Sequence, residues 1–86
     1  MIKDITTKSG FCVSVDMDML DNVEFLDALA ELSESGLGMS KIATMLLGTD
    51  GKKTLYNHVR SAKGTVPAEK LMNEFTEIME LLGAKN

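Results

Sequence analysis

Side chains that could carry out chemistry are few and scattered in this chain of 86 residues. His58 is the single histidine, and no second histidine or cysteine stands at metal-ligand spacing from it. Cys12 is the single cysteine, so it has no partner for an internal disulfide and no CxxC motif that would mark a redox-active thiol. We therefore expect His58 to be a surface or capping residue and Cys12 to be a half-buried strand residue.

Two short patterns resemble ligand sites but lack essential members. Asp16, Asp18 and Asp21 are spaced like the first ligands of a calcium loop, yet the glycine and the terminal glutamate of that loop are missing. The stretch GTDG, residues 48–51, has two glycines but does not match a phosphate-binding loop. No GxSxG motif accompanies the serines. The sequence thus predicts a protein that is not an enzyme and has no metal and no cofactor.

The composition is that of a folded, water-exposed protein. It is 44% hydrophobic and 26% charged, with a net charge of −4. No apolar run approaches the roughly 20 residues that cross a bilayer, and the start MIKDITTKSG lacks the apolar core of a secretory signal. We expect one domain over residues 1–86, in a reducing cytoplasm and without membrane contact.

Alternating residues at the start of the chain predict a β-hairpin over residues 1–16. Phe11, Val13 and Val15 fall on one face of a strand. The β-branched segment IKDITT can pair with it, and Lys8-Ser9-Gly10 can form the turn because glycine tolerates a positive φ. An isolated hairpin is barely stable in water, so this one must pack against the residues that follow.

Helical spacing dominates the rest of the chain. Phe25, Leu29 and Leu32 share one face, and Asp21 with Glu24 three residues later predicts a capped start. The glycines of GTDG separate two further apolar patterns, which predicts a turn between two helices. The expected fold is mainly α (α+β): an N-terminal β-hairpin followed by four short helices in a compact bundle, over residues 21–34, 40–47, 50–62 and 67–82.

The last of these helices has the most regular pattern. Pro67 suits its first turn and Gly83 its end. Its apolar side chains step by three and four positions and share one face: Ala68, Leu71, Phe75, Ile78 and Leu82.

Charge is distributed unevenly along the sequence. Residues 1–36 carry two lysines against eight acids, a net charge of −6, whereas residues 37–70 carry six basic residues against two acids, a net charge of +4. The basic side chains Lys52, Lys53 and Arg60 either lie in water or contact the acidic half of an adjacent copy. The second alternative predicts a homo-oligomer that weakens as salt rises.

Residues 42–63 resemble the helix-turn-helix of tetracycline-repressor-type regulators. The resemblance rests on Ile42 and Ala43, followed by Leu55, Tyr56 and His58. It implies a DNA-binding regulator as an alternative function. The extra residues in the turn and the acidic net charge favour another interpretation, in which the protein does not bind nucleic acid.

Nearly the whole chain resembles the small tail assembly chaperones of long-tailed bacteriophages and prophages of Gram-positive hosts. The resemblance is carried by the order and spacing of LLG at 46–48, LYNHVR at 55–60 and GTVPA at 64–68, before a glutamate-rich last helix. It implies a non-catalytic protein that binds the helical tape measure protein and keeps it soluble until tail-tube subunits polymerise. It also implies a location in the host bacterial cytoplasm and absence from the mature virion. A prophage adaptor of unrelated function is a third interpretation.

Methionines are the candidate partner-binding residues. Seven methionines in 86 residues is a high number, and flexible thioether side chains suit a surface that accepts many apolar sequences. The alternative is that they fill an irregular core. The candidates lie in the helical part: Met39, Met45, Met72 and Met79.

The family resemblance also implies a longer product made by ribosomal frameshifting, through which the tail tube protein would be contacted. The residues Ala84-Lys85-Asn86 are those that a slippery A-AAA-AAC heptamer encodes in frame. We therefore expect a minor extended product beyond Asn86, which a gene without such a nucleotide run would disprove.

Overall fold

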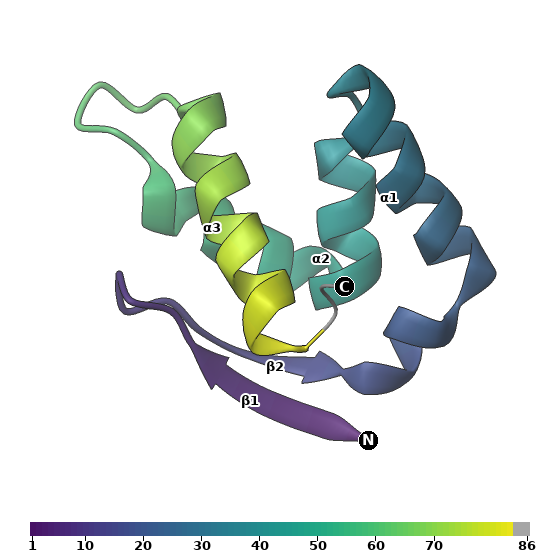
Figure 1. The fold of residues 1–86 in the computed structure, drawn as a ribbon. Coiled ribbons are helices and arrows are strands. Elements are labelled where there is room, and N and C mark those ends of the chain that lie inside the picture. The colour runs from purple at the N-terminus through teal and green to yellow at the C-terminus, as the bar shows by residue number, and fades with distance from the viewer. Residues whose placement is uncertain (84–86) are drawn as a thin grey trace.

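The N-terminal residues form an antiparallel hairpin in the computed structural model, which describes residues 1–83 (Figure 1). Strand β1 (Ile2–Thr6) pairs with β2 (Cys12–Asp16), and Ile5 lies opposite Val13. Gly10 has a φ of 96°, so the expected glycine turn is confirmed. The hairpin lies along one side of the molecule and the helices lie on the other.

The two faces of the hairpin differ as the alternation predicts. Phe11 and Val15 are buried beneath the helices and Val13 is half-buried, which confirms the inward face. Cys12 belongs to the outward face and is exposed, so the expectation that it is half-buried is wrong. The thiol accepts a hydrogen bond from the Thr6 hydroxyl across the strand pair at 3.3 Å.

A short 3-10 helix that the sequence analysis did not predict, η1 (Met17–Asp21), connects β2 to the first α-helix, α1 (Val23–Ser35). Asn22, and not Asp21, caps α1, because its side-chain oxygen accepts a hydrogen bond from the Glu24 amide at 2.9 Å. The helix therefore begins two residues later than expected. It ends as expected at Gly36, which has a φ of 74°.

The two helices expected over 40–47 and 50–62 are joined across a kink at Gly48 into one bent element, α2 (Met39–Val59), so residues 1–83 form three α-helices and not four. Of the residues in GTDG, only Gly48 leaves the helical conformation, with φ 79° and ψ 169°. The following residues resume the helix at once, because a single glycine suffices to change its direction. The C-terminal boundary is also earlier than expected, since Arg60 has an extended backbone.

A contact between the two halves of α2 shows how strongly the chain turns at Gly48. The Lys52 ammonium donates a hydrogen bond to the Ser40 hydroxyl at 2.6 Å. Twelve residues of an unbroken helix would span about 18 Å, which is far more than a lysine side chain can reach. Figure 1 shows the first half of α2 beside α1 and the second half directed away from α1.

The last helix, α3 (Ala68–Leu81), agrees closely with the prediction. Pro67 occupies the N-cap position with φ −65°, directly before the first helical residue. Gly83 follows the helix with a φ of 76°. All members of the predicted apolar seam except Ala68 are buried: Leu71, Phe75, Ile78 and Leu82.

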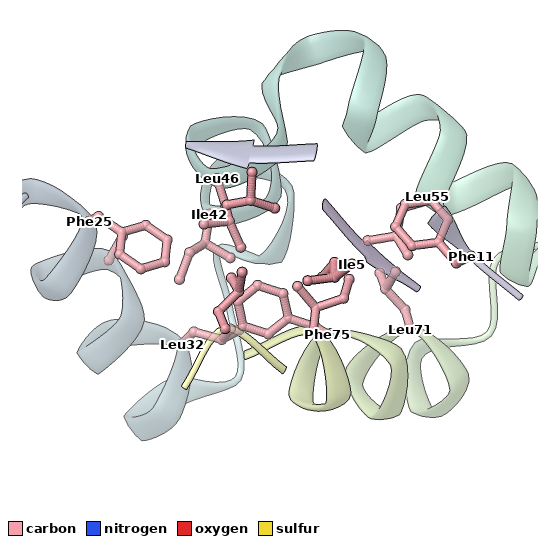
Figure 2. Packing of buried hydrophobic residues seen from close by; sticks show 13 residues of the cluster. Ile5, Phe11, Phe25, Leu32, Ile42, Leu46, Leu55, Leu71 and Phe75 are labelled. Atoms are coloured by element: carbon pink, nitrogen blue, oxygen red, sulfur yellow. The ribbon is translucent and has the colours of Figure 1, made fainter. Parts of the chain in front are cut away.

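One hydrophobic core joins the hairpin to all three helices. Figure 2 shows Phe25 and Ile42 at one end of this core, Leu55 and Phe11 at the other, and Phe75 between them. Burying a side chain of this size stabilises the fold by about 1.5–3 kcal/mol. The radius of gyration, 12.3 Å, is close to the value of about 12 Å typical of a compact chain of this length. The fold thus uses its one core to hold α1 and α3 on either side of the first half of α2.

Candidate functional site

An apolar groove of ≈260 Å³ runs between α1 and α3. Its floor is Leu32 from α1 and Phe75 from α3, which are 4% and 3% exposed. Figure 2 shows these two side chains pointing toward one another. The remaining lining is Leu29, Ser33, Met72, Thr76 and Met79.

The walls of this α1–α3 groove are open to solvent. Leu29 and Met79 are half-buried, and Met72 is 36% exposed. None of the lining residues is charged, and the only polar ones are Ser33 and Thr76. A surface of this kind removes apolar side chains of a partner from water, and its two hydroxyl groups have no histidine or charged residue beside them in the lining.

The structure brings two of the four candidate methionines together in the α1–α3 groove. Met72 and Met79 lie seven residues apart on α3, so they stand two helical turns apart on the same wall. Met39 is half-buried and packs against the core. Met45 is also half-buried, and it lines a different depression.

That second depression lies between α1 and the first half of α2 and has an acidic rim. Its volume is ≈760 Å³. Lys41 and Met45 come from the α2 side. The acidic residues recur every three or four positions along one flank of α1: Glu24, Asp27, Glu31 and Glu34.

The three basic residues that the sequence suggested for self-association do not form one free patch. Lys52 is held by Ser40 and lies 5.3 Å from the centre of the Tyr56 ring. The Arg60 guanidinium donates to the Gly64 carbonyl at 2.7 Å and to the Asn57 side chain at 3.1 Å, which stabilises the loop before α3. Lys53 is exposed on the second half of α2.

A polar network that the sequence analysis did not identify connects the hairpin turn to α2 and α3. Glu74 is only 8% exposed, and its carboxylate accepts hydrogen bonds from the hydroxyls of Thr7 and Ser9, the latter at 2.9 Å. Ser9 Oγ also lies 2.8 Å from His58 Nε2. The exposed His58 ring, for its part, lies 5.5 Å from the ring of Phe11.

The geometry of this network differs from that of a nucleophilic serine site. In such a site the histidine takes the serine proton and the carboxylate holds the other ring nitrogen. Here the Ser9 hydroxyl donates directly to Glu74, which leaves His58 Nε2 to act as a donor to Ser9. The arrangement therefore favours a structural role, in which a buried carboxylate holds the turn against the helices.

A sequence signal for this network does exist. Glu74 stands three residues after Leu71 and four before Ile78, so a carboxylate occupies the buried face of an otherwise apolar seam. A buried carboxylate needs hydrogen-bond donors from elsewhere in the chain. The sequence could thus have identified the acceptor, but not its partners in the hairpin turn.

The aspartates around η1 have partners within the chain. The Asp16 carboxylate caps η1 by accepting from the Asp18 amide at 3.0 Å. Both carboxylates also lie 3.7 Å from the N-terminal ammonium group. Across residues 1–83, no cluster of three or more His, Cys, Asp or Glu side chains is placed to hold a metal ion.

Residues 42–63, which resemble a helix-turn-helix, lack a separate turn in the structure. Most of this stretch belongs to α2, whose direction changes at Gly48 alone, and residues 60–63 lie beyond the helix. The residues on which the frameshift hypothesis rests, 84–86, lie outside the described part of the chain.

Within residues 1–83, none of the helices combines the length and the apolar character that crossing a lipid bilayer requires. Comparison of the chain with protein-family models, with curated proteins and with solved structures gives no match. The function must therefore be argued from the sequence resemblance and from the geometry of the α1–α3 groove.

Proposed function

We propose that this protein is a non-catalytic tail assembly chaperone of a bacteriophage or prophage, which binds the tape measure protein and keeps it soluble during tail assembly. The sequence resemblance suggests the family. The observation that carries the proposal is the α1–α3 groove, because it presents Met72 and Met79 beside an apolar floor.

The dimensions of the groove suit a helical partner. Met72 and Met79 are about 10 Å apart along the axis of α3, which matches two turns of a helix that presents apolar side chains at positions i, i+3 or i+4, and i+7. Methionine side chains adapt their shape to different apolar neighbours. The same groove can therefore accept successive segments of a long helical protein.

This proposal places the protein in the host bacterial cytoplasm during assembly and not in the finished virion. Several copies would coat one tape measure molecule and be displaced as tail-tube subunits polymerise. A groove of uncharged, weakly specific contacts suits such temporary binding, because an adaptable surface can bind many segments without binding any of them irreversibly.

Co-expression with the tape measure protein of the same genome tests the proposal. We expect the tape measure protein to stay soluble and to co-purify with the wild-type chain. The double variant Met72→Gln, Met79→Gln should lose most of this effect, since binding through a few apolar contacts falls about tenfold or more when two central ones are removed.

Leu81→Gln provides the matched control for the methionine variants. Leu81 is 38% exposed, close to the 36% of Met72, and lies on the same helix, but it does not line the groove. The control should behave like the wild-type chain. If the tape measure protein precipitates even with the wild-type chain, the proposal is wrong, and titration with DNA at low salt then tests the alternative of a regulator.

A further inference from the structure

We infer that the α1–α3 groove selects an amphipathic helix whose apolar stripe is flanked by lysine or arginine. This inference rests on the proposed function, because it takes the groove to be the surface that receives the partner. The inference specifies the charge of the residues beside the apolar stripe of the partner helix. Neither the apolar lining of the groove nor the sequence resemblance specifies this charge.

The apolar surface is wider than the groove itself. Leu26 lies one helical turn before Leu29 on α1 and is 47% exposed. Leu26 shares a face of α1 with Ser33, seven residues later, so it extends the α1 wall of an apolar strip whose other wall holds Met72 and Met79. An apolar strip that runs for two turns between two helices fits one face of a third helix, whose diameter is about 10 Å.

Carboxylates stand beyond the α3 wall of this strip. On α3, Glu69 is one turn before Met72, and Glu80 is one turn after Thr76. Thr76 borders the groove on one side and, on the other, a depression that contains Glu77, Glu80 and the single basic residue Lys8, so acidic side chains outnumber basic ones on this flank.

The nearest carboxylates of α1 lie farther from the groove. Asp27 and Glu34 follow Leu26 and Ser33, so they point about 100° around α1 from those two residues, and they line the depression toward α2 that also contains Lys41. The ion pairs found within residues 1–83 join the terminal ammonium to Asp16 and Asp18. Since Glu69 and Glu80 are exposed and take no part in those pairs, their charge can act on a partner.

The negative charge beside the α1–α3 groove distinguishes between the helices that could occupy it. A helix that buries an apolar stripe between the walls places the side chains along its α3 flank near Glu69 and Glu80. Lysine or arginine at those positions is attracted, whereas glutamate or an anionic lipid surface is repelled. The groove therefore favours a basic amphipathic helix over an acidic one with the same apolar stripe.

Two synthetic helical peptides test the inference without the tape measure protein. Both carry leucine at positions i, i+3, i+4 and i+7, and they differ only in flanking lysines or flanking glutamates. Fluorescence anisotropy of labelled peptides should show roughly tenfold tighter binding of the lysine-flanked peptide at 50 mM salt, because several exposed charge pairs add small contributions. The preference should shrink at 500 mM salt.

Variants of the protein test which of its side chains produce the preference for the lysine-flanked peptide. Glu69→Gln with Glu80→Gln should weaken the lysine-flanked peptide alone, and the Met72→Gln, Met79→Gln variant should weaken both peptides. Asp50→Asn, at an exposed acid near the bend of α2, should change neither. A proline-containing version of the lysine-flanked peptide, which cannot form the helix, should bind at least tenfold more weakly.

Equal binding of the two peptides would overturn the inference, as would lysine-flanked binding that is unaffected by the methionine variant. The result is separable from the proposed function. If the lysine-flanked peptide binds but the tape measure protein is not kept soluble, the function is wrong and the inference stands. If the tape measure protein is kept soluble but the two peptides bind equally, the proposed function stands and the inference about flanking charge is wrong.

Discussion

A single carboxylate, that of Glu74, connects parts of the chain that are 67 residues apart. It accepts from Thr7 and Ser9, and Thr7 Oγ1 in turn accepts from the Phe11 amide at 3.1 Å. These groups are polar atoms in or beside the core. Their hydrogen bonds offset the cost of burying them, and the loss of one partner leaves the others without a donor or acceptor.

Replacing Glu74 tests this account of the network. Glu74→Ala should lower the free energy of unfolding by about 1–3 kcal/mol, because it leaves two hydroxyls with an unmet partner. Glu80→Ala, at an exposed position of the same helix, should stay within about 0.5 kcal/mol of the wild type. Urea unfolding followed by circular dichroism measures both, and equal losses would contradict a structural role for the network.

At the scale of elements, the bend in α2 determines where the helices stand. The backbone of Gly48, with φ 79° and ψ 169°, lies in a region that only glycine adopts without strain. This conformation directs the second half of α2 away from α1. A hydrogen bond between Lys52 and Ser40 joins the two halves across the bend.

An asparagine pair tests how specific the requirement at Gly48 is. Gly36 has φ 74° and ψ 7°, the left-handed helical conformation that asparagine tolerates. Gly36→Asn should therefore cost less than about 1 kcal/mol of unfolding free energy, whereas Gly48→Asn should cost about 1–3 kcal/mol. Thermal and urea unfolding of both variants would show the difference. Similar costs at the two sites would mean that the bend tolerates other backbone conformations.

The same elements show how far the sequence predicts the fold. The α3 seam was predicted almost to the residue because its apolar period, Pro67 and Gly83 all indicate the same boundaries. The bend was predicted as a turn because GTDG has the composition of a loop. The contact between the two halves of α2, which joins residues twelve positions apart, cannot be recognised from local composition, and residues 49–51 are helical in the structure.

The candidate site was predictable to a similar extent. The seven-residue spacing of Met72 and Met79 places them on one face of a helix, and the structure confirms that they share a wall. The opposite wall could not be derived, because it depends on how α1 and α3 pack on α2. Met45 has the same residue type and helical setting, yet it faces the acidic depression.

At the scale of the whole molecule, charge is separated in space as well as in sequence. The flank of α1 carries the acidic row of the second depression, and the exposed Lys53 lies on the second half of α2. We propose that two copies attract one another when the α1 flank of one meets the α2 surface of the other. Because Lys52 and Arg60 are bound within the chain, Lys53 is the residue that remains for such a contact.

Salt should weaken this self-association. Sedimentation velocity at 50 mM and 500 mM salt should show larger species at the lower concentration, because exposed charges are screened within about 10 Å at 0.1 M salt and within less at higher salt. Lys53→Glu should reduce association at 50 mM salt and have little effect at 500 mM. An oligomer that persists unchanged at both concentrations would show that apolar contacts hold the copies together.

The attachment of the hairpin to α3 has a consequence for the order in which the chain can fold. The Lys8 amide donates to Glu77 at 2.7 Å, and the Lys3 ammonium donates to the Leu81 carbonyl at 3.0 Å. The hairpin thus finds some of its partners in α3, at the far end of the described residues, in addition to those within the hairpin and in α2. Although α2 also packs on the hairpin, the part of the inward face that α3 covers stays exposed until α3 has been synthesised, so the core can be completed only after that point.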